Sequence, residues 1–294
     1  MAIYDVNGNS IATPYDVDGN SLLHVYDVDG NMLTGENQFK VCSYNVGGWY
    51  IGSGTNVPSD KDTAFYNLQN GIISDINADI LCIEEYWSIF SQSGRTAQSL
   101  LSQYYPYIET ADGTAQYYGR AICSKFPISS YIKHYFTGET RYYDEAVINI
   151  LGESVHVFVT HLHPSNSTTR IAEATELYNY IQTQGYDKYI ICGDFNSTLY
   201  DPMSEVNIGI YKQFLDVGCN IANDGDFGIL DTACNSADWD TDKFAIDNII
   251  ASDGFTFESV NTNLSKTTNA DVLATGKIDH VPIYAIIELD GIGA

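Results

Sequence analysis

Short apolar runs that end in polar residues are the feature that most limits what this chain can fold into. They begin at Phe39 and alternate with amphipathic stretches of helical periodicity, a pattern typical of an α/β domain. No Pro- or Ser-rich linker interrupts this region, so we expect one domain over residues 38–294. Strands are predicted near 39–45, 79–84, 117–124, 130–136, 144–150, 153–160, 188–192, 244–251 and 281–289, and helices near 61–77, 94–102, 168–184 and 204–216.

Residues 1–37 form a separate, repetitive segment. A Tyr-Asp-Val-Asn/Asp-Gly-Asn pattern starts at Tyr4, Tyr15 and Tyr26, a period of 11 residues. Asn-Gly and Asp-Gly between short apolar segments predict β-hairpin turns. A calcium-binding loop is disfavoured because the glycine follows the second acidic or amide position directly, unlike in an EF-hand. We expect an acidic β-hairpin repeat arm that serves association or tethering.

The chain carries a large excess of negative charge. It has 13 Lys and Arg against 38 Asp and Glu, a net charge of −25, which repels polyanions at long range. This balance excludes a protein that passively coats nucleic acid, but not an enzyme that binds a phosphodiester through a cation. Any affinity for nucleic acid is expected to be weak and metal-dependent.

The sequence shows neither an apolar run long enough for a membrane helix nor a Sec-type signal peptide at its N-terminus. The prediction is a cytoplasmic protein, with association with a virion or a surface as the alternative. Four of the six cysteines lie in apolar, strand-like segments and are expected to be free thiols. A disulfide remains possible only between Cys219 and Cys234.

Polar side chains stand where four predicted strands end. In α/β sheets ligands gather outside the carboxyl ends of the strands, so these side chains are expected to converge. Asp279 and His280 instead precede the last strand, and an antiparallel strand begins at the edge where its neighbours end. Carboxylate and amide oxygens suit Mg²⁺, whereas no thiolates occur at a zinc-like spacing. The residues at the strand ends are Asn45, Glu84, Glu85, His161, Asp194 and Asn196.

In order along the chain, these segments resemble the motifs of the endonuclease/exonuclease/phosphatase superfamily, the deoxyribonuclease I-like proteins. Gly193-Asp194-Phe195-Asn196 is the most specific match. The other matching segments are Ser43–Val46, Asp79–Glu85, Thr160–Leu162, Ile246–Ile250 and Asp279–Pro282. The resemblance implies an α/β fold, specifically a four-layer α/β/β/α sandwich of the deoxyribonuclease I-like type.

The resemblance also implies a role for each site residue. Mg²⁺, or Mn²⁺ in its place, would be held by Asn45, Glu85 and Asp279. Asp194 would act on the attacking water, Asn196 and His161 would contact the phosphate, and Asp247 would orient the catalytic His280. Arg141 precedes a predicted strand, and two roles are open for it: binding the substrate phosphate or forming a salt bridge.

The implied reaction is Mg²⁺-dependent hydrolysis of a phosphodiester. Gly47 stands where the abasic-site endonucleases carry an acid, and a histidine at position 161 is typical of the branch with deoxyribonuclease I, the sphingomyelinases and the inositol polyphosphate phosphatases. An endonuclease is the first choice and a lipid or inositol phosphoesterase the alternative. A non-catalytic surface or phage-associated binding module is disfavoured because every expected polar position is occupied.

Overall fold

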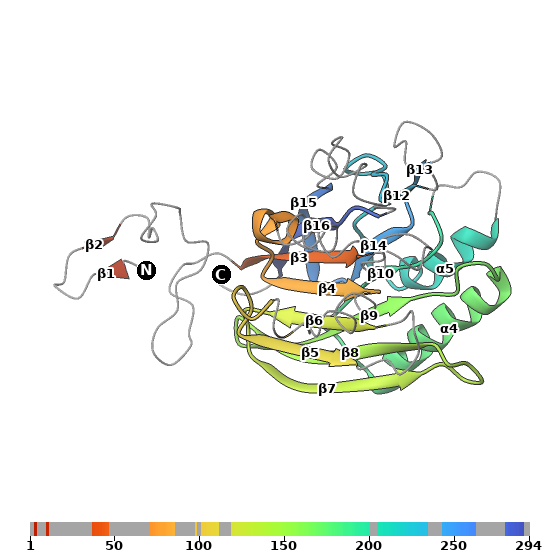
Figure 1. Cartoon of the computed structure of the whole chain (residues 1–294), viewed down its shortest axis with the longest axis horizontal. Coiled ribbons are helices and arrows are strands. Elements are labelled where there is room, and N and C mark those ends of the chain that lie inside the picture. Colours follow the sequence, from red (N-terminus) through yellow and green to blue (C-terminus); the bar gives the residue numbers. More distant parts are fainter. Residues whose placement is uncertain are drawn as a thin grey trace, which may run out of the picture.

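The computed structural model describes residues 3–4, 10–11, 37–46, 71–85, 98, 101–111, 119–199, 205–234, 243–262 and 280–290. Within these residues, two six-stranded sheets pack face to face and helices cover their outer faces (Figure 1). None of the described helices is both long enough and apolar enough to span a membrane.

The first sheet has the strand order β15-β16-β3-β4-β6-β5. Strands β3 and β4 are parallel, with Asn45 opposite Glu84, and β16 runs antiparallel to β3. The carboxyl ends of β3 and β4 and the start of β16 therefore lie at one edge. The strands are β3 (Gln38–Asn45), β4 (Ile80–Glu84), β5 (Tyr107–Ala111), β6 (Arg120–Ser124), β15 (Phe255–Thr262) and β16 (Ile283–Leu289).

The second sheet has the order β11-β14-β10-β9-β8-β7. Strands β9 and β10 are parallel with Asp194 opposite His161, and β14 runs antiparallel to β10 with Asp247 opposite Asp194. Three polar residues thus share one edge. The strands are β7 (Ile128–Tyr135), β8 (Tyr142–Ile150), β9 (Glu153–His161), β10 (Tyr189–Asp194), β11 (Asn220–Ile221) and β14 (Asp247–Ala251).

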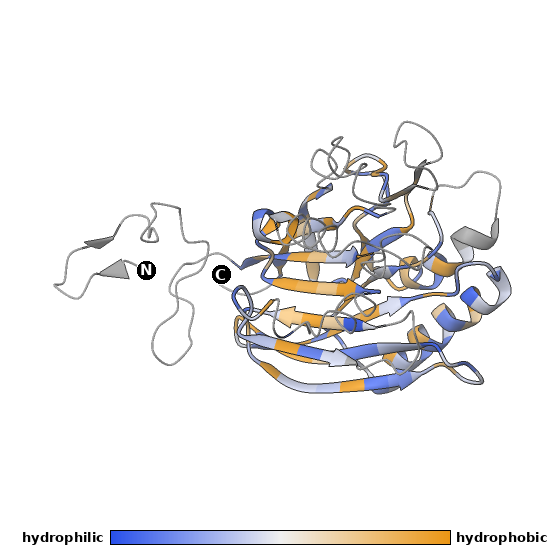
Figure 2. Ribbon diagram, viewed as in Figure 1, coloured by the Kyte–Doolittle hydropathy of each residue, from blue (hydrophilic) through white to orange (hydrophobic). Residues whose placement is uncertain are grey.

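Apolar residues fill the space between the sheets, and β4 is coloured mainly as hydrophobic (Figure 2). On the outer face of the second sheet, helices α4 (Ser167–Gln184) and α5 (Glu205–Leu215) pack Leu177 and Phe214 against Phe158. The helical segment 71–76 covers the first sheet by packing Ile72 against Leu81. The order helix, sheet, sheet, helix confirms the predicted four-layer sandwich.

Smaller elements complete the described chain. β12 (Ala233–Cys234) pairs with β13 (Lys243–Phe244), and β1 (Ile3–Tyr4), where the first repeat begins, pairs antiparallel with β2 (Ser10–Ile11). The second and third repeats of the predicted arm lie outside the described residues. Cys219 is a free thiol with its Sγ 3.0 Å from the hydroxyl of Tyr189, so it does not form the disulfide that the sequence left open.

Candidate active site

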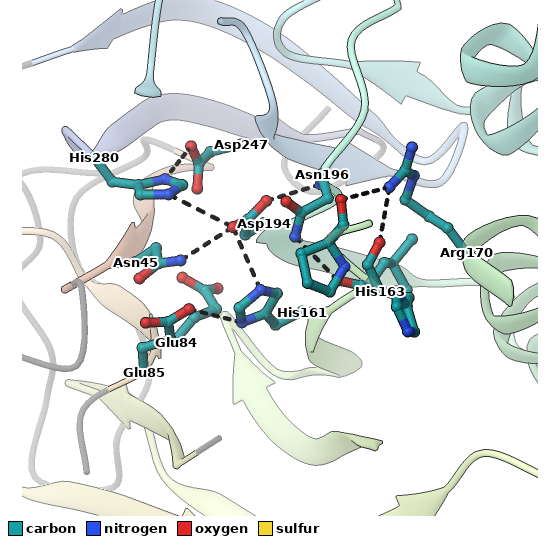
Figure 3. A network of polar contacts seen from close by, with 12 residues as sticks. Asn45, Glu84, Glu85, His161, His163, Arg170, Asp194, Asn196, Asp247 and His280 are labelled. Atoms are coloured by element: carbon teal, nitrogen blue, oxygen red, sulfur yellow. Dashed lines mark hydrogen bonds and ion pairs between the residues drawn. The ribbon is translucent and has the colours of Figure 1, made fainter. Parts of the chain in front are cut away.

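Polar side chains from both sheets meet at the edge where β3, β4, β9 and β10 end (Figure 3). Asn45, Glu84 and Glu85 come from the first sheet, and His280 lies just before β16. His161, Asp194 and Asp247 come from the second sheet. Every predicted site residue that the structure describes at the strand ends belongs to this group, whereas Asp279 lies outside the described residues.

Asp194 lies at the centre of the cluster (Figure 3). Its Oδ2 accepts a hydrogen bond from Asn45 Nδ2 at 3.0 Å, and its Oδ1 accepts one from the backbone N–H of Asn196 at 2.8 Å. The carboxyl is almost fully buried, and burial together with the charge of Asp247 raises its pKa to about 7. Asp194 is therefore held in place while its charge is poorly solvated.

His280 is oriented by the buried Asp247. Its Nδ1 lies 2.9 Å from Asp247 Oδ2, and a carboxylate at that position keeps the ring proton on Nδ1. The other nitrogen, Nε2, lies 3.7 Å from Asp194 Oδ2. That separation is too long for a direct hydrogen bond, and a water molecule placed beside the two atoms can lie within hydrogen-bond distance of both.

His161 lies on the opposite side of Asp194. Its Nε2 is 3.6 Å from Asp194 Oδ2 and its Nδ1 is 3.4 Å from Glu85 Oε1. Burial, with the nearby charges of Arg141 and Arg120, lowers the pKa of His161 well below its usual value. The imidazole is therefore neutral at pH 7.

Two site residues have left-handed backbone conformations, which residues other than glycine rarely adopt. Glu85 has φ 56° and Asn196 has φ 49°. Such strain is concentrated at functional sites, where the surrounding structure enforces it. The chain turns sharply at these residues, just after β4 and β10 end.

A steric constraint explains why the Gly193-Asp194-Phe195-Asn196 motif begins with glycine. A Cβ at position 193 would lie 2.3 Å from the backbone oxygen of Thr160 on the neighbouring strand β9. Only glycine lets β10 approach β9 this closely, so Gly193 sets the spacing between His161 and Asp194.

Arg141 fixes the backbone that follows His161. Its Nη2 donates to the carbonyl oxygens of His161 and Leu162, the latter at 2.7 Å, and its Nε lies 3.3 Å from Glu173 Oε1. Asn196 Nδ2 also donates to Leu162 O, at 3.0 Å. Of the two roles left open for Arg141, the structure shows the salt bridge.

Helix α4 holds the next part of the same loop. Glu173 Oε2 accepts from the backbone N–H of His163 at 2.7 Å, and Arg170 Nη1 donates to the carbonyls of His163 and Pro164 at 2.8 and 3.1 Å. Sequence reasoning missed both residues. The available signal was that positions 170 and 173 continue the buried stripe of Ala174, Leu177 and Ile181, where charged residues are unusual.

Carboxylates gather around Asp194 in a buried volume. The ligand atoms of Asp194, Asp247 and His280 all lie within 4.8 Å of one another. Glu84 is completely buried, Ser43 Oγ donates to its Oε1 at 3.1 Å, and burial with the charges of Asp247 and Asp194 raises its pKa. A divalent cation would offset this repulsion, and the oxygen-rich donor set, with Asn45 and Glu85 among it, fits Mg²⁺ or Mn²⁺.

The model of the Endonuclease/Exonuclease/phosphatase family matches residues 42–267. No curated protein sequence matches the chain at a significant level.

Among solved structures, the zebrafish (D. rerio) TDP2 complexed with a single-strand DNA product has a TM-score of 0.65 at 13% identity, over 85% of this chain and 99% of that one. The human Nocturnin catalytic domain with a bound sulfate anion has a TM-score of 0.62 at 19% identity, over 86% and 95%. Truncated Caenorhabditis elegans TDP2 has a TM-score of 0.62 at 18% identity, over 85% and 97%. At these identities the likeness establishes the fold.

Proposed function

Because the chain belongs to the endonuclease/exonuclease/phosphatase family, whose model matches residues 42–267, we propose that this phosphoesterase hydrolyses phosphodiester bonds of nucleic acid with the help of Mg²⁺, as a deoxyribonuclease I-like endonuclease does. The observation that carries the proposal is the convergence of Asn45, Glu85, His161, Asp194 and the Asp247–His280 pair at one edge of the sandwich.

Asp194 and His280 are positioned to act on the attacking water. Both Asp194 Oδ2 and His280 Nε2 face the 3.7 Å gap between them, and Asp247 keeps the His280 proton on the other nitrogen. A water molecule beside these two atoms would donate one proton to Asp194. The raised pKa of Asp194, about 7, lets its carboxylate accept that proton near neutral pH.

His161 and Asn196 are proposed to face the phosphoryl oxygens. Both are rigidly held, since Arg141 and Asn196 anchor the backbone after His161 and the N–H of Asn196 bonds to Asp194. A neutral imidazole and an amide act as hydrogen-bond donors to oxygens whose charge grows toward the transition state. Preorganised donors of this kind cost no rearrangement during the reaction.

Asn45 and Glu85 are the proposed metal ligands, with Asp279 as a third candidate. When bound, Mg²⁺ or Mn²⁺ would neutralise charge on a non-bridging phosphoryl oxygen. Asn45 also donates to Asp194, so one side chain would connect the metal site to the residue that acts on water.

The proposed substrate is a nucleic acid. One structural neighbour was solved with a single-strand DNA product and another with a sulfate anion, which has the charge and shape of a phosphate. The net charge of −25 remains compatible with this substrate because hydrolysis requires only transient, cation-assisted contact.

The test is a screen for hydrolysis with Mg²⁺ over plasmid DNA, single-stranded DNA, RNA, sphingomyelin, inositol phosphates and bis(p-nitrophenyl) phosphate. We expect turnover of nucleic acid and of the chromogenic diester. Asp194→Ala should abolish it, whereas Asp216→Ala, an exposed carboxylate on a surface ion pair, should leave it unchanged. Hydrolysis of sphingomyelin or inositol phosphates alone would replace the nuclease assignment, and no activity on any substrate would refute the proposal.

A further inference from the structure

A row of side chains extends from the active site to the free edge of the second sheet. Tyr143 on β8 is opposite Thr160 on β9, and Tyr135 on β7 is opposite Tyr142 on β8. The next position of the β8–β9 register brings Tyr142 level with His161. His161, Tyr142 and Tyr135 therefore follow one another on one face of three neighbouring strands, and the row spans about 10 Å between its outer Cα atoms.

Two cations lie along this row. Arg120 extends from β6 of the other sheet with its guanidinium carbon 4.1 Å from the centre of the Tyr142 ring, and its Nη2 is 3.4 Å from His161 O. Lys133 Nζ lies 3.9 Å from the centre of the Tyr142 ring and 5.3 Å from that of Tyr135. The rings of Tyr135 and Tyr142 are themselves 5.8 Å apart. Lys133, Tyr135 and Tyr142, called the tyrosine–lysine rim below, are thus in continuous contact with the site.

The outer end of the rim is open to solvent. Tyr135 is 61% exposed, whereas Tyr142 is 3% exposed, so the row runs from a buried ring beside the site to an exposed one. An exposed tyrosine on an edge strand has no role in the core. Its ring face is available to a planar ligand.

Lys133 differs from the other lysines whose side chains the structure describes. Each of those four donates to a carbonyl or a carboxylate: Lys40, Lys125, Lys188 and Lys212. Lys133 lies over two aromatic rings instead, and its register partner on β8 is the buried Asp144. Because the Lys133 ammonium group is held over aromatic rings and not on a carboxylate oxygen, its charge is available to an anion beside the site.

We infer that the tyrosine–lysine rim binds the nucleotide next to the scissile phosphodiester, with its base stacked on Tyr135 and its phosphate against Lys133. The inference rests on the proposed function and narrows its substrate to single-stranded nucleic acid. In a duplex the faces of a base are covered by its stacked neighbours, whereas an unpaired base can stack on an aromatic side chain whatever its sequence.

The experiment compares three substrates: a single-stranded oligonucleotide, the matched duplex, and methyl p-nitrophenyl phosphate, which is too short to reach from the site to Tyr135. Tyr135→Ala should raise KM for the single strand by roughly 5- to 150-fold, the loss expected for one stacked base, and leave hydrolysis of the small diester unchanged. Tyr135→Trp should restore the KM. Lys133→Gln should also raise the KM and make it less dependent on salt.

Tyr107→Ala is the matched control, because Tyr107 is also a partly exposed tyrosine on an edge strand. Tyr107 lies opposite Ser124, at the end of β6 that is distant from Arg120. It should change none of the three activities. An unchanged KM in Tyr135→Ala, or an equal loss on the small diester, would overturn the rim inference. The inference would also be overturned if Tyr135→Ala floated less with sphingomyelin vesicles than the wild type while its KM for the oligonucleotide was unchanged. The rim would then be a surface that binds lipid. If the wild-type protein hydrolyses none of these substrates, the proposed function itself fails.

Discussion

Replacing Arg141 by methionine tests how the loop after β9 is held. Methionine keeps an unbranched side chain of similar length but removes the guanidinium. The buried carbonyls of His161 and Leu162 then lose a donor, and the carboxylate of Glu173 loses its cation. The substitution therefore removes one partner from a buried polar network.

The expected cost is large. The Arg141 and Glu173 side chains are 5% and 2% exposed, and breaking such a buried pair costs about 3–5 kcal/mol, of a total unfolding free energy of about 5–15 kcal/mol. Burial raises the pKa of Glu173 even beside Arg141. The loss should therefore be smaller at acidic pH, where Glu173 can be neutral without its partner.

Urea unfolding followed by circular dichroism measures this cost. Lys188→Met is the control: its ion pair with Glu153 is shorter, at 2.7 Å, but its side chains are 30% and 42% exposed, and such a pair contributes less than about 1 kcal/mol. Arg141→Met should also lower kcat on bis(p-nitrophenyl) phosphate with little change in KM, because His161 is displaced. A raised KM with unchanged stability would refute the reasoning and place Arg141 against the substrate phosphate.

Four further outcomes are expected. Gly193→Ala should lower the free energy of unfolding in urea by about 1–3 kcal/mol or more, because the new Cβ would lie 2.3 Å from Thr160 O. Gly71→Ala, where a Cβ would have nothing within 4 Å, should not lower it. Equal effects of the two substitutions would contradict the steric argument. Asp247→Asn should lower kcat by at least about 100-fold with an unchanged melting temperature, since His280 loses its orienting carboxylate; a near-normal kcat would remove the pair from catalysis. Chelation with EDTA should abolish turnover, and Mg²⁺ should restore it without change in far-ultraviolet circular dichroism; turnover that survives chelation would exclude the metal role. Burial raises the pKa of Asp144 to about 6, so its ionisation destabilises the folded wild-type protein as the pH rises above 4. The free energy of unfolding of Asp144→Asn should therefore rise by about 3 kcal/mol relative to the wild type between pH 4 and pH 7. A difference in urea unfolding that does not depend on pH would contradict this.

The strand pattern of the sequence predicted most strands of the sandwich, but not β5, β11 and β15. In β15 only Phe255 and Val260 are buried, because the strand lies at the edge of its sheet with one face toward solvent. Its strand conformation depends on backbone hydrogen bonds to β16, a partner more than 20 residues later in the chain. The hydrophobicity of the segment itself therefore does not predict this pairing.

The sequence by itself indicated an α/β domain and the polar residues at its strand ends, because strand periodicity and the residue at a strand's end are local properties and parallel neighbours bring such ends together. The family and the four-layer sandwich followed from the resemblance of its motifs to those of known proteins. Only the tertiary structure decided what surrounds the polar residues: the partners of Arg141, the loop contacts of Arg170 and Glu173, and the tyrosine–lysine rim. The physical reason is that these contacts join strands, or a loop and a helix, through side chains whose approach depends on how the layers pack. No spacing along the chain encodes that approach.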